Sequence, residues 1–343
     1  MAGFRINEQE PRREDTGGRD EGENRSCPQT YQGRGESRLM PSSQISRSLV
    51  NLIRTLLRQP QSAVGTALAL FFFLLALFGT QLAPYPNPND QSHDVRQSPT
   101  LDFAKLQLGE HPFGTDRLGR DVYSRVILGA SSIFRIAGLG TLVSVILGSA
   151  LGLFMGYQGG WVDEILGRVI DATLAIPALL LALVLVGIIR NLDFEAGSWQ
   201  AGLADNVVLL VIAVLYIPIV ARVARSSTLD IRTREFVAAA EIRGESQAYI
   251  IFREILPSVI PSLVVEASLR FSYAIFLVAS LGFLGFGARP PSPDWGLMVN
   301  ENRGGFYQLT PWALEFPALA IAVLVIAVNL MSDGIRRAVQ KGV

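Results

Sequence analysis

Glu266 and Arg270 are the residues whose types and spacing offer chemistry most directly, because both are charged and lie inside the apolar run 259–287. They are one helical turn apart with the glutamate first, which is the favourable order for an i,i+4 ion pair. A charge inside a membrane costs roughly 2.5–3.5 kcal/mol and usually faces the bundle interior or a cavity. Two interpretations stay open: the residues neutralise each other within the helix, or they line a pathway and meet charged groups of a solute.

Other kinds of chemistry are excluded by what the sequence lacks. The single cysteine, Cys27, can form neither an internal disulfide nor a multi-cysteine metal site, and His93 and His111 have no ligand spacing. The only lysines, Lys105 and Lys341, are not followed by the Ser or Thr of a phosphate-binding P-loop. The 30 basic and 30 acidic residues give a net charge of zero, which argues against nucleic-acid binding. We therefore predict no metal, no bound cofactor and no bond chemistry in this chain.

The elements that position the charged pair are apolar runs long enough to cross a membrane. Of the 343 residues, 49% are apolar and 17% are charged, against about 25% charged in soluble proteins. A helix needs about 20 apolar residues to span the hydrocarbon core. We predict an all-α, polytopic membrane protein with six transmembrane helices, at 63–83, 136–156, 169–189, 206–221, 259–287 and 313–331.

The polar segments complete the predicted organisation. Residues 1–45 are polar and mixed in charge, which predicts a disordered tail, and the arginines of 46–62 predict a short interfacial helix. Residues 84–130 form an extracytoplasmic segment, in which the neighbours Asp116–Arg117 and Arg120–Asp121 predict a charge-laced helix start. Residues 333–343 form the C-terminal end.

The basic residues predict the orientation in the cytoplasmic (inner) membrane. Cytoplasmic loops carry an excess of Lys and Arg. With the N-terminus inside, 20 of the 30 basic residues fall in cytoplasmic segments and 8 in outer segments. The prediction is that both termini are cytoplasmic, with cytoplasmic segments at 1–62, 157–168, 222–258 and 332–343.

Three glycines predict close helix packing in the second span. Gly148, Gly152 and Gly156 recur every four residues and share one helical face. Small residues at this spacing let another helix approach closely, and such packing drives helix association in lipid.

The cytoplasmic segment 222–258 is the candidate functional loop. Residues 235–243 predict a helix that ends at Gly244, a residue able to adopt φ > 0, and a second short amphipathic helix is predicted to run to Phe252. Small side chains on such a knob permit close approach by a partner protein. The candidate coupling residues are Glu235, Ala238, Ala239, Ala240, Glu241, Gly244, Leu256 and Pro257.

This loop resembles the EAA loop of ABC importer permeases, whose pattern is Glu-Ala-Ala, three residues, Gly, nine residues, Ile, one residue, Leu-Pro. The spacing is intact from Ala239 to Pro257, but Ala238 replaces the glutamate and Glu254 the isoleucine. Further stretches at 111–121, 283–287 and 290–296 are similar to those of the "C" permease subunits of the dipeptide, oligopeptide and nickel importer family. The resemblance covers residues 60 to 337.

The resemblance implies a type I ABC importer permease fold, with its transmembrane domain at 131–332. It also implies a homologous second permease, two ATP-binding subunits that hold ATP and Mg²⁺, and an extracytoplasmic substrate-binding protein, besides membrane lipid. The solute would be a peptide, or a nickel complex or other small solute. The alternative is a self-sufficient secondary carrier or channel, for which Glu266 is the one candidate coupling carboxylate.

Overall fold

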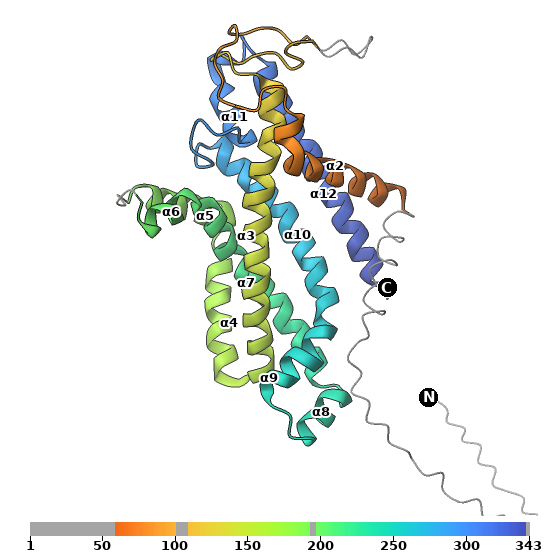
Figure 1. Ribbon diagram of the computed structural model, residues 1–343. Helices are drawn as coiled ribbons and strands as arrows, with labels where there is room; N and C mark the ends of the chain where they lie inside the picture. Colours follow the sequence, from red (N-terminus) through yellow and green to blue (C-terminus); the bar gives the residue numbers. More distant parts are fainter. Residues whose placement is uncertain (1–58, 101–108, 193–196, 341–343) are drawn as a thin grey trace, which may run out of the picture.

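The computed structural model describes residues 59–100, 109–192 and 197–340, which form helices and connecting loops (Figure 1). The all-α class predicted from the sequence is confirmed. The predicted tail 1–45 and nearly all of the predicted interfacial helix 46–62 lie outside the described residues.

Five of the described helices are long and apolar enough to cross a membrane. The first begins with Pro60 at a position where the missing N–H costs nothing, because the first turn has no acceptor for it. These helices are α2 (Pro60–Leu82), α3 (Val122–Gln158), α7 (Val207–Arg232), α10 (Leu256–Phe283) and α12 (Trp312–Gln340). A sixth span is counted if the bent pair α4 (Gly160–Leu174) and α5 (Ala178–Arg190) crosses as one.

The bent pair corrects the prediction of one continuous helix at 169–189. The axes of α4 and α5 differ by 88°, and the break falls between Leu174 and Ala178. Pro177 explains the break, since it has no N–H for the helical ladder and disfavours the helical conformation of the residue before it. In Figure 1, α5 and the short α6 (Trp199–Asp205) turn away from the long axis that α4 follows.

Other helices extend beyond the spans predicted for them, among them α12, which was predicted to end at 331 but runs to Gln340. The second span was predicted at 136–156, but α3 begins at Val122, where the Asp121 carboxylate accepts a hydrogen bond from Ser124 N. The fourth was predicted at 206–221, but α7 continues to Arg232. The apolar residues mark the part of a helix that lies within the membrane, whereas the helix itself continues beyond that part to its capping residues. The predicted loop 222–258 is consequently helical over most of its length.

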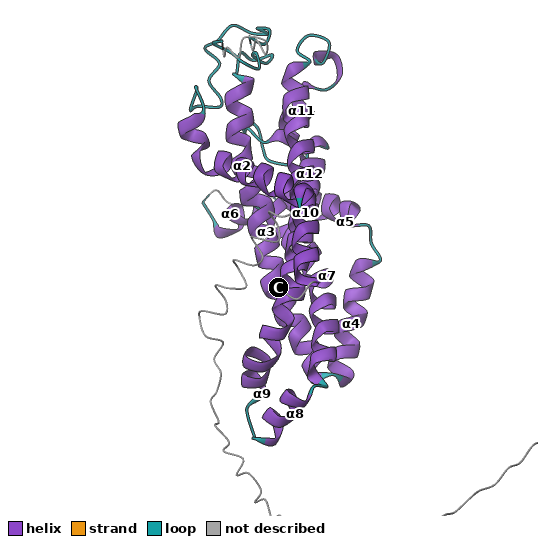
Figure 2. Ribbon diagram, turned by 90° about the vertical axis from the view of Figure 1, so that its right-hand side faces the viewer, coloured by secondary structure: helices purple, strands orange, loops and turns teal. Residues whose placement is uncertain are grey.

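The core lies between α3 and α7, with α10, α12 and α2 packed around this pair. Fully buried side chains from four helices meet there: Ile133, Ile212, Ile275 and Leu324. The short helices α8 (Glu235–Ile242) and α9 (Gln247–Tyr249) lie at one end of the bundle, and α11 (Trp295–Asn302) lies at the opposite end with the segment before α3 (Figures 1 and 2). The two polar ends are therefore joined mainly by long helices.

Candidate functional site

A compact projection stands at the end of the bundle that carries α8. We call α8 together with the turn 243–246 the α8 knob. The turn is a Schellman motif: Gly244 N donates to Glu241 O at 3.0 Å, and Glu245 N donates to Ala240 O at 3.2 Å. Gly244 has φ +79°, the left-handed conformation expected from the sequence. The Ser246 hydroxyl then accepts a hydrogen bond from Tyr249 N and caps the next helix.

One face of α8 is fixed to the bundle. Val237 and Ala240 are fully buried and belong to an apolar cluster with Leu153 of α3 and Val259 of α10. Helix α8 packs directly against α7 and against the helical turn Ile250–Ile255 that follows it, so the knob is not suspended on a flexible loop.

The other face of α8 is open. Ala238 and Ala239 are exposed, Ile242 is 88% exposed and Phe236 is 39% exposed. Of the alanine triplet, the structure thus presents two outward and buries Ala240. Exposed apolar side chains beside small residues form a surface that a partner can cover closely.

Charged residues brace the turn. Arg243 lies 3.6 Å from Glu245 and 3.5 Å from Glu254. Glu254 occupies the position that departs from the EAA pattern, and its carboxylate joins the turn to the helix that follows. Glu235 is exposed in the first turn of α8, where a negative charge complements the helix dipole.

The sequence predicted that the helix after the knob ends at Phe252, but in the structure this helix continues. From Gln247 to Phe283 the chain is a single 37-residue helical stretch, which includes the π-helical turn η1 (Ile250–Ile255). Within it, Leu256 N donates to Ile251 O, five residues back, immediately before Pro257, which has no N–H to donate. A continuous helical stretch thus connects the knob to the far end of α10.

The three glycines of α3 lie against α7. A Cβ atom on Gly148 would be 2.7 Å from Val220 Cβ, one on Gly152 would be 2.6 Å from Ala224 Cβ, and one on Gly156 would be 2.7 Å from Thr228 Cβ. These separations are far below van der Waals contact. Only glycine permits the two backbones to lie this close.

Gly152→Val is therefore expected to separate α3 from α7. Overpacking of a well-packed interface typically costs about 1–3 kcal/mol. We expect a lower yield of monodisperse protein and a lower melting temperature in detergent. The matched control is Gly138→Val on the same helix, where the nearest neighbour of a new Cβ, a Phe271 ring carbon, is 3.9 Å away. Equal stability of the two variants would contradict close packing at Gly152.

Glu266 and Arg270 form an ion pair near the middle of α10, with 2.8 Å between Arg270 Nε and Glu266 Oε1. Their side chains are 10% and 14% exposed. Neither of these two atoms has a hydrogen-bond partner, so their close contact is an ion pair that is not aligned as a hydrogen bond. The Arg270 guanidinium also lies over the rings of Tyr216 and Tyr273, at 5.6 and 4.9 Å from their centroids.

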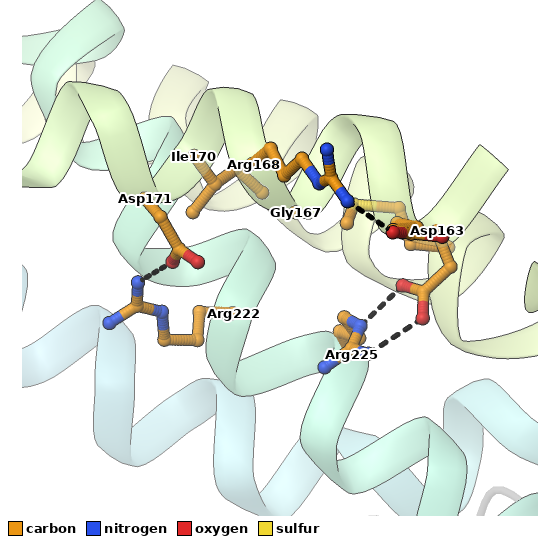
Figure 3. Close-up of a pocket in the computed structure, with 9 residues that line it drawn as sticks. Asp163, Gly167, Arg168, Ile170, Asp171, Arg222 and Arg225 are labelled. Atoms are coloured by element: carbon orange, nitrogen blue, oxygen red, sulfur yellow. Dashed lines mark hydrogen bonds and ion pairs between the residues drawn. The ribbon is translucent and has the colours of Figure 1, made fainter. Parts of the chain in front are cut away.

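A second ion-pair cluster, which the sequence did not predict, joins α4 to α7 around an open pocket of about 270 Å³ (Figure 3). Arg225 Nη2 donates to Asp163 Oδ2 at 2.6 Å, and Arg222 pairs with Asp171. Ile170 is the only buried residue of α4. Helix α4 therefore meets its neighbours through these ion pairs and through the apolar cluster of Ile170 with Met155 and Ala221.

The opposite end of the bundle carries a buried charge network. The helix start predicted from the neighbours Asp116–Arg117 and Arg120–Asp121 is present, with Asp121 as the cap of α3, but Arg120 does not pair with this neighbour. Arg120 instead contacts Asp116 at 2.6 Å and Glu301 at 2.7 Å. Burial lowers the pKa of Arg120, but these two carboxylates outweigh burial and raise it.

Two further contacts complete this end. His111 Nδ1 lies 2.9 Å from Asp121 Oδ1, and the Arg117 guanidinium covers the Phe306 ring at 4.6 Å. Local spacing gave no signal for Glu301, which is 181 residues from Arg120. Among the described residues, no three His, Cys, Asp or Glu side chains converge as a metal site would require.

Comparison with known proteins gives consistent similarities. Residues 148–343 match the family described as binding-protein-dependent transport system inner membrane component. The chain is 34% identical to the dipeptide transport system permease protein DppC of Alkalihalophilus pseudofirmus, over 80% of this chain and 84% of that protein. It is 37% identical to DppC of Haemophilus influenzae, over 80% and 89%.

One further relative and one solved structure are also similar to the chain. The chain is 35% identical to the glutathione transport system permease protein GsiD of Pectobacterium atrosepticum, over 83% of this chain and 88% of that protein. A chain of the inward-facing MetNI methionine ABC transporter shares the fold, with a TM-score of 0.50 and 16% identity over 63% of this chain and 96% of that one.

Proposed function

The chain belongs to the family of binding-protein-dependent transport system inner membrane components, and on this premise we propose that it forms half of a peptide pathway and couples it to ATP hydrolysis through the α8 knob. The chain is the permease component of an ABC importer, and hydrolysis of ATP belongs to other chains. The observation that carries the coupling role is the two-sided α8, which is fixed on one face to α7 and to the helical stretch that leads into α10, and is open on the other.

The open face fits an ATP-binding subunit. Ala238 and Ala239 allow close backbone approach, while Ile242 supplies apolar area that association removes from water. Because buried Val237 and Ala240 fix α8 to the bundle, a force on the knob passes into the membrane helices instead of bending a loop.

The continuous helix from Gln247 to Phe283 supplies the lever. At 1.5 Å per residue, its 37 residues extend about 55 Å, enough to run from the knob through a bilayer. ATP binding closes two partner ATPase subunits, the knob moves with them, and α10 tilts between inward- and outward-facing arrangements. Energy enters because the partners bind the two arrangements with different affinity.

The rest of the assembly follows from the same proposal. A homologous second permease supplies the other half of the pathway, two ATP-binding subunits with ATP and Mg²⁺ dock on the knobs, and an extracytoplasmic binding protein delivers substrate to the end that carries α11. The knob is cytoplasmic, and both termini lie on the same side as the knob. The excess of basic residues in segments 1–62 and 222–258 supports this orientation.

The substrate is a peptide. DppC relatives are named for dipeptide transport and GsiD relatives for glutathione transport, and both kinds of substrate contain peptide bonds and charged termini. A nickel complex or another small solute is the second possibility that the sequence left open. A screen of ligands for the cognate binding protein decides between these solutes.

Co-purification tests the proposed function. With the neighbouring genes co-expressed, the tagged chain in mild detergent is expected to retain a second permease and ATPase subunits. Proteoliposomes that contain this complex and the binding protein are expected to take up peptide only with ATP. Recovery of this chain alone, with uptake driven by an ion gradient and no ATP, would instead establish the secondary carrier.

A further inference from the structure

Arg270 has more hydrogen-bonding capacity than its surroundings use. A guanidinium has five N–H donors in a planar fork. Within the described parts of the chain, Arg270 Nε is buried without a hydrogen-bond partner, and its 2.8 Å contact with Glu266 Oε1 is close but misaligned. Buried polar groups are nearly always hydrogen-bonded, so an unused donor in the middle of a membrane helix requires an explanation.

The position of Arg270 gives its guanidinium access to a ligand. Glu266, Tyr273, Phe276 and Ser280 share one face of α10, because their spacing of seven, ten and fourteen residues keeps them within a third of the helix circumference. Tyr273 is 54% exposed and Phe276 is 59% exposed, so this face is open in the chain described here. Arg270 borders that face and is itself 14% exposed.

The aromatic neighbours hold the guanidinium in place without using its donors. The rings of Tyr216 and Tyr273 offer their faces at 5.6 and 4.9 Å, which stabilises the cation while its N–H groups point along the guanidinium plane. A carboxylate is the complementary ligand, since its two oxygens match the two N–H groups of the fork.

We propose that Arg270 binds the C-terminal carboxylate of a peptide in transit, at a station halfway through the membrane. The proposal rests on the proposed function and names the substrate group that this site recognises. Glu266 keeps the resting site neutral. When a carboxylate arrives, the amino group of the same peptide can balance Glu266, so a zwitterionic peptide adds no net charge in the membrane. A C-terminally amidated peptide brings a positive charge and no partner for Arg270.

Uptake by the complete complex in proteoliposomes tests this proposal. The probes are one dipeptide with a free C-terminus and the same dipeptide as its amide, both with ATP and the binding protein. The measured quantity is the free-to-amide ratio of initial rates, compared between wild type and the Glu266→Gln, Arg270→Gln double variant. Selection by the binding protein is common to both complexes and cancels in this comparison.

The double variant leaves no unpaired charge, so it is expected to assemble. We expect its free-to-amide ratio to fall roughly tenfold or more below that of wild type, because the hydrogen bonds between the guanidinium and the carboxylate are lost. Arg270→Lys, which keeps the charge and loses the fork, is expected to give an intermediate ratio. The matched control is Arg168→Gln, which removes an arginine that is 78% exposed.

An unchanged ratio in a double variant that still transports with ATP overturns the carboxylate station and leaves the proposed function intact. A wild-type complex that shows no ATP-dependent uptake contradicts the proposed function instead. A control variant that shifts the ratio as far as the double variant also overturns the proposal, since the effect would then be nonspecific.

Discussion

Gly244→Val is expected to leave the complex assembled and to abolish most of its transport. Gly244 has φ +79°, which costs an ordinary residue about 1–2 kcal/mol and a β-branched one more. A Cβ atom at Gly244 would meet no atom within 4 Å, so the effect arises from the backbone alone. The Schellman turn must then open, and α8 changes its angle to α10. Uptake should fall roughly tenfold or more, because each 1.4 kcal/mol lost from a contact corresponds to a factor of ten.

The measurement is ATP-dependent peptide uptake beside ATPase activity and recovery of the partner subunits. Gly244→Asn is the matched control, because asparagine tolerates the left-handed conformation. Ala239→Asp tests the same contact without altering the turn, by placing a charge on the exposed face where an apolar contact is expected. Near-normal uptake in both Gly244→Val and Ala239→Asp would remove the coupling role from the α8 knob.

The local features of the knob were accessible from sequence because each depends on a few consecutive residues. Gly244 lies at the position where a helix of good formers ends, and glycine is the usual residue for the left-handed turn that follows. The helical content and the long spans were predictable for the same reason. Pro177 carried a signal too, but an apolar run does not state whether a proline will kink a helix or break it by 88°.

Contacts between distant residues were not predictable. Arg120 is next to Asp121 in the sequence, but in the fold it pairs with the distant Glu301. Similarly, Asp163 on α4 meets Arg225 on α7, and no periodicity within either helix indicates that meeting. Such pairs follow from the packing of whole helices, which a single sequence without homologues does not specify.

Glu266 and Arg270 were paired by an i,i+4 rule, and the structure brings their charged atoms to 2.8 Å. What the rule did not give is the misalignment of that contact, which leaves Arg270 Nε buried without a hydrogen-bond partner. A stability experiment separates what the ion pair contributes to folding from what its charges contribute to transport. Folding requires only that neither charge is left unpaired, whereas transport requires the charges themselves.

Glu266→Gln is expected to damage assembly strongly, and the further change Arg270→Gln to restore it. Removing one partner of a buried pair leaves an uncompensated charge and typically costs about 3–5 kcal/mol, whereas removing both leaves neutral side chains of similar size. The measurement is the yield and melting temperature of the purified complex for both single variants and the double variant. Arg168→Gln serves as control, since its partner Glu164 is 63% exposed and surface pairs contribute little. If the single variants are as stable as the double variant, the pair does not stabilise α10. Its charges then act on the transported peptide rather than on the stability of α10.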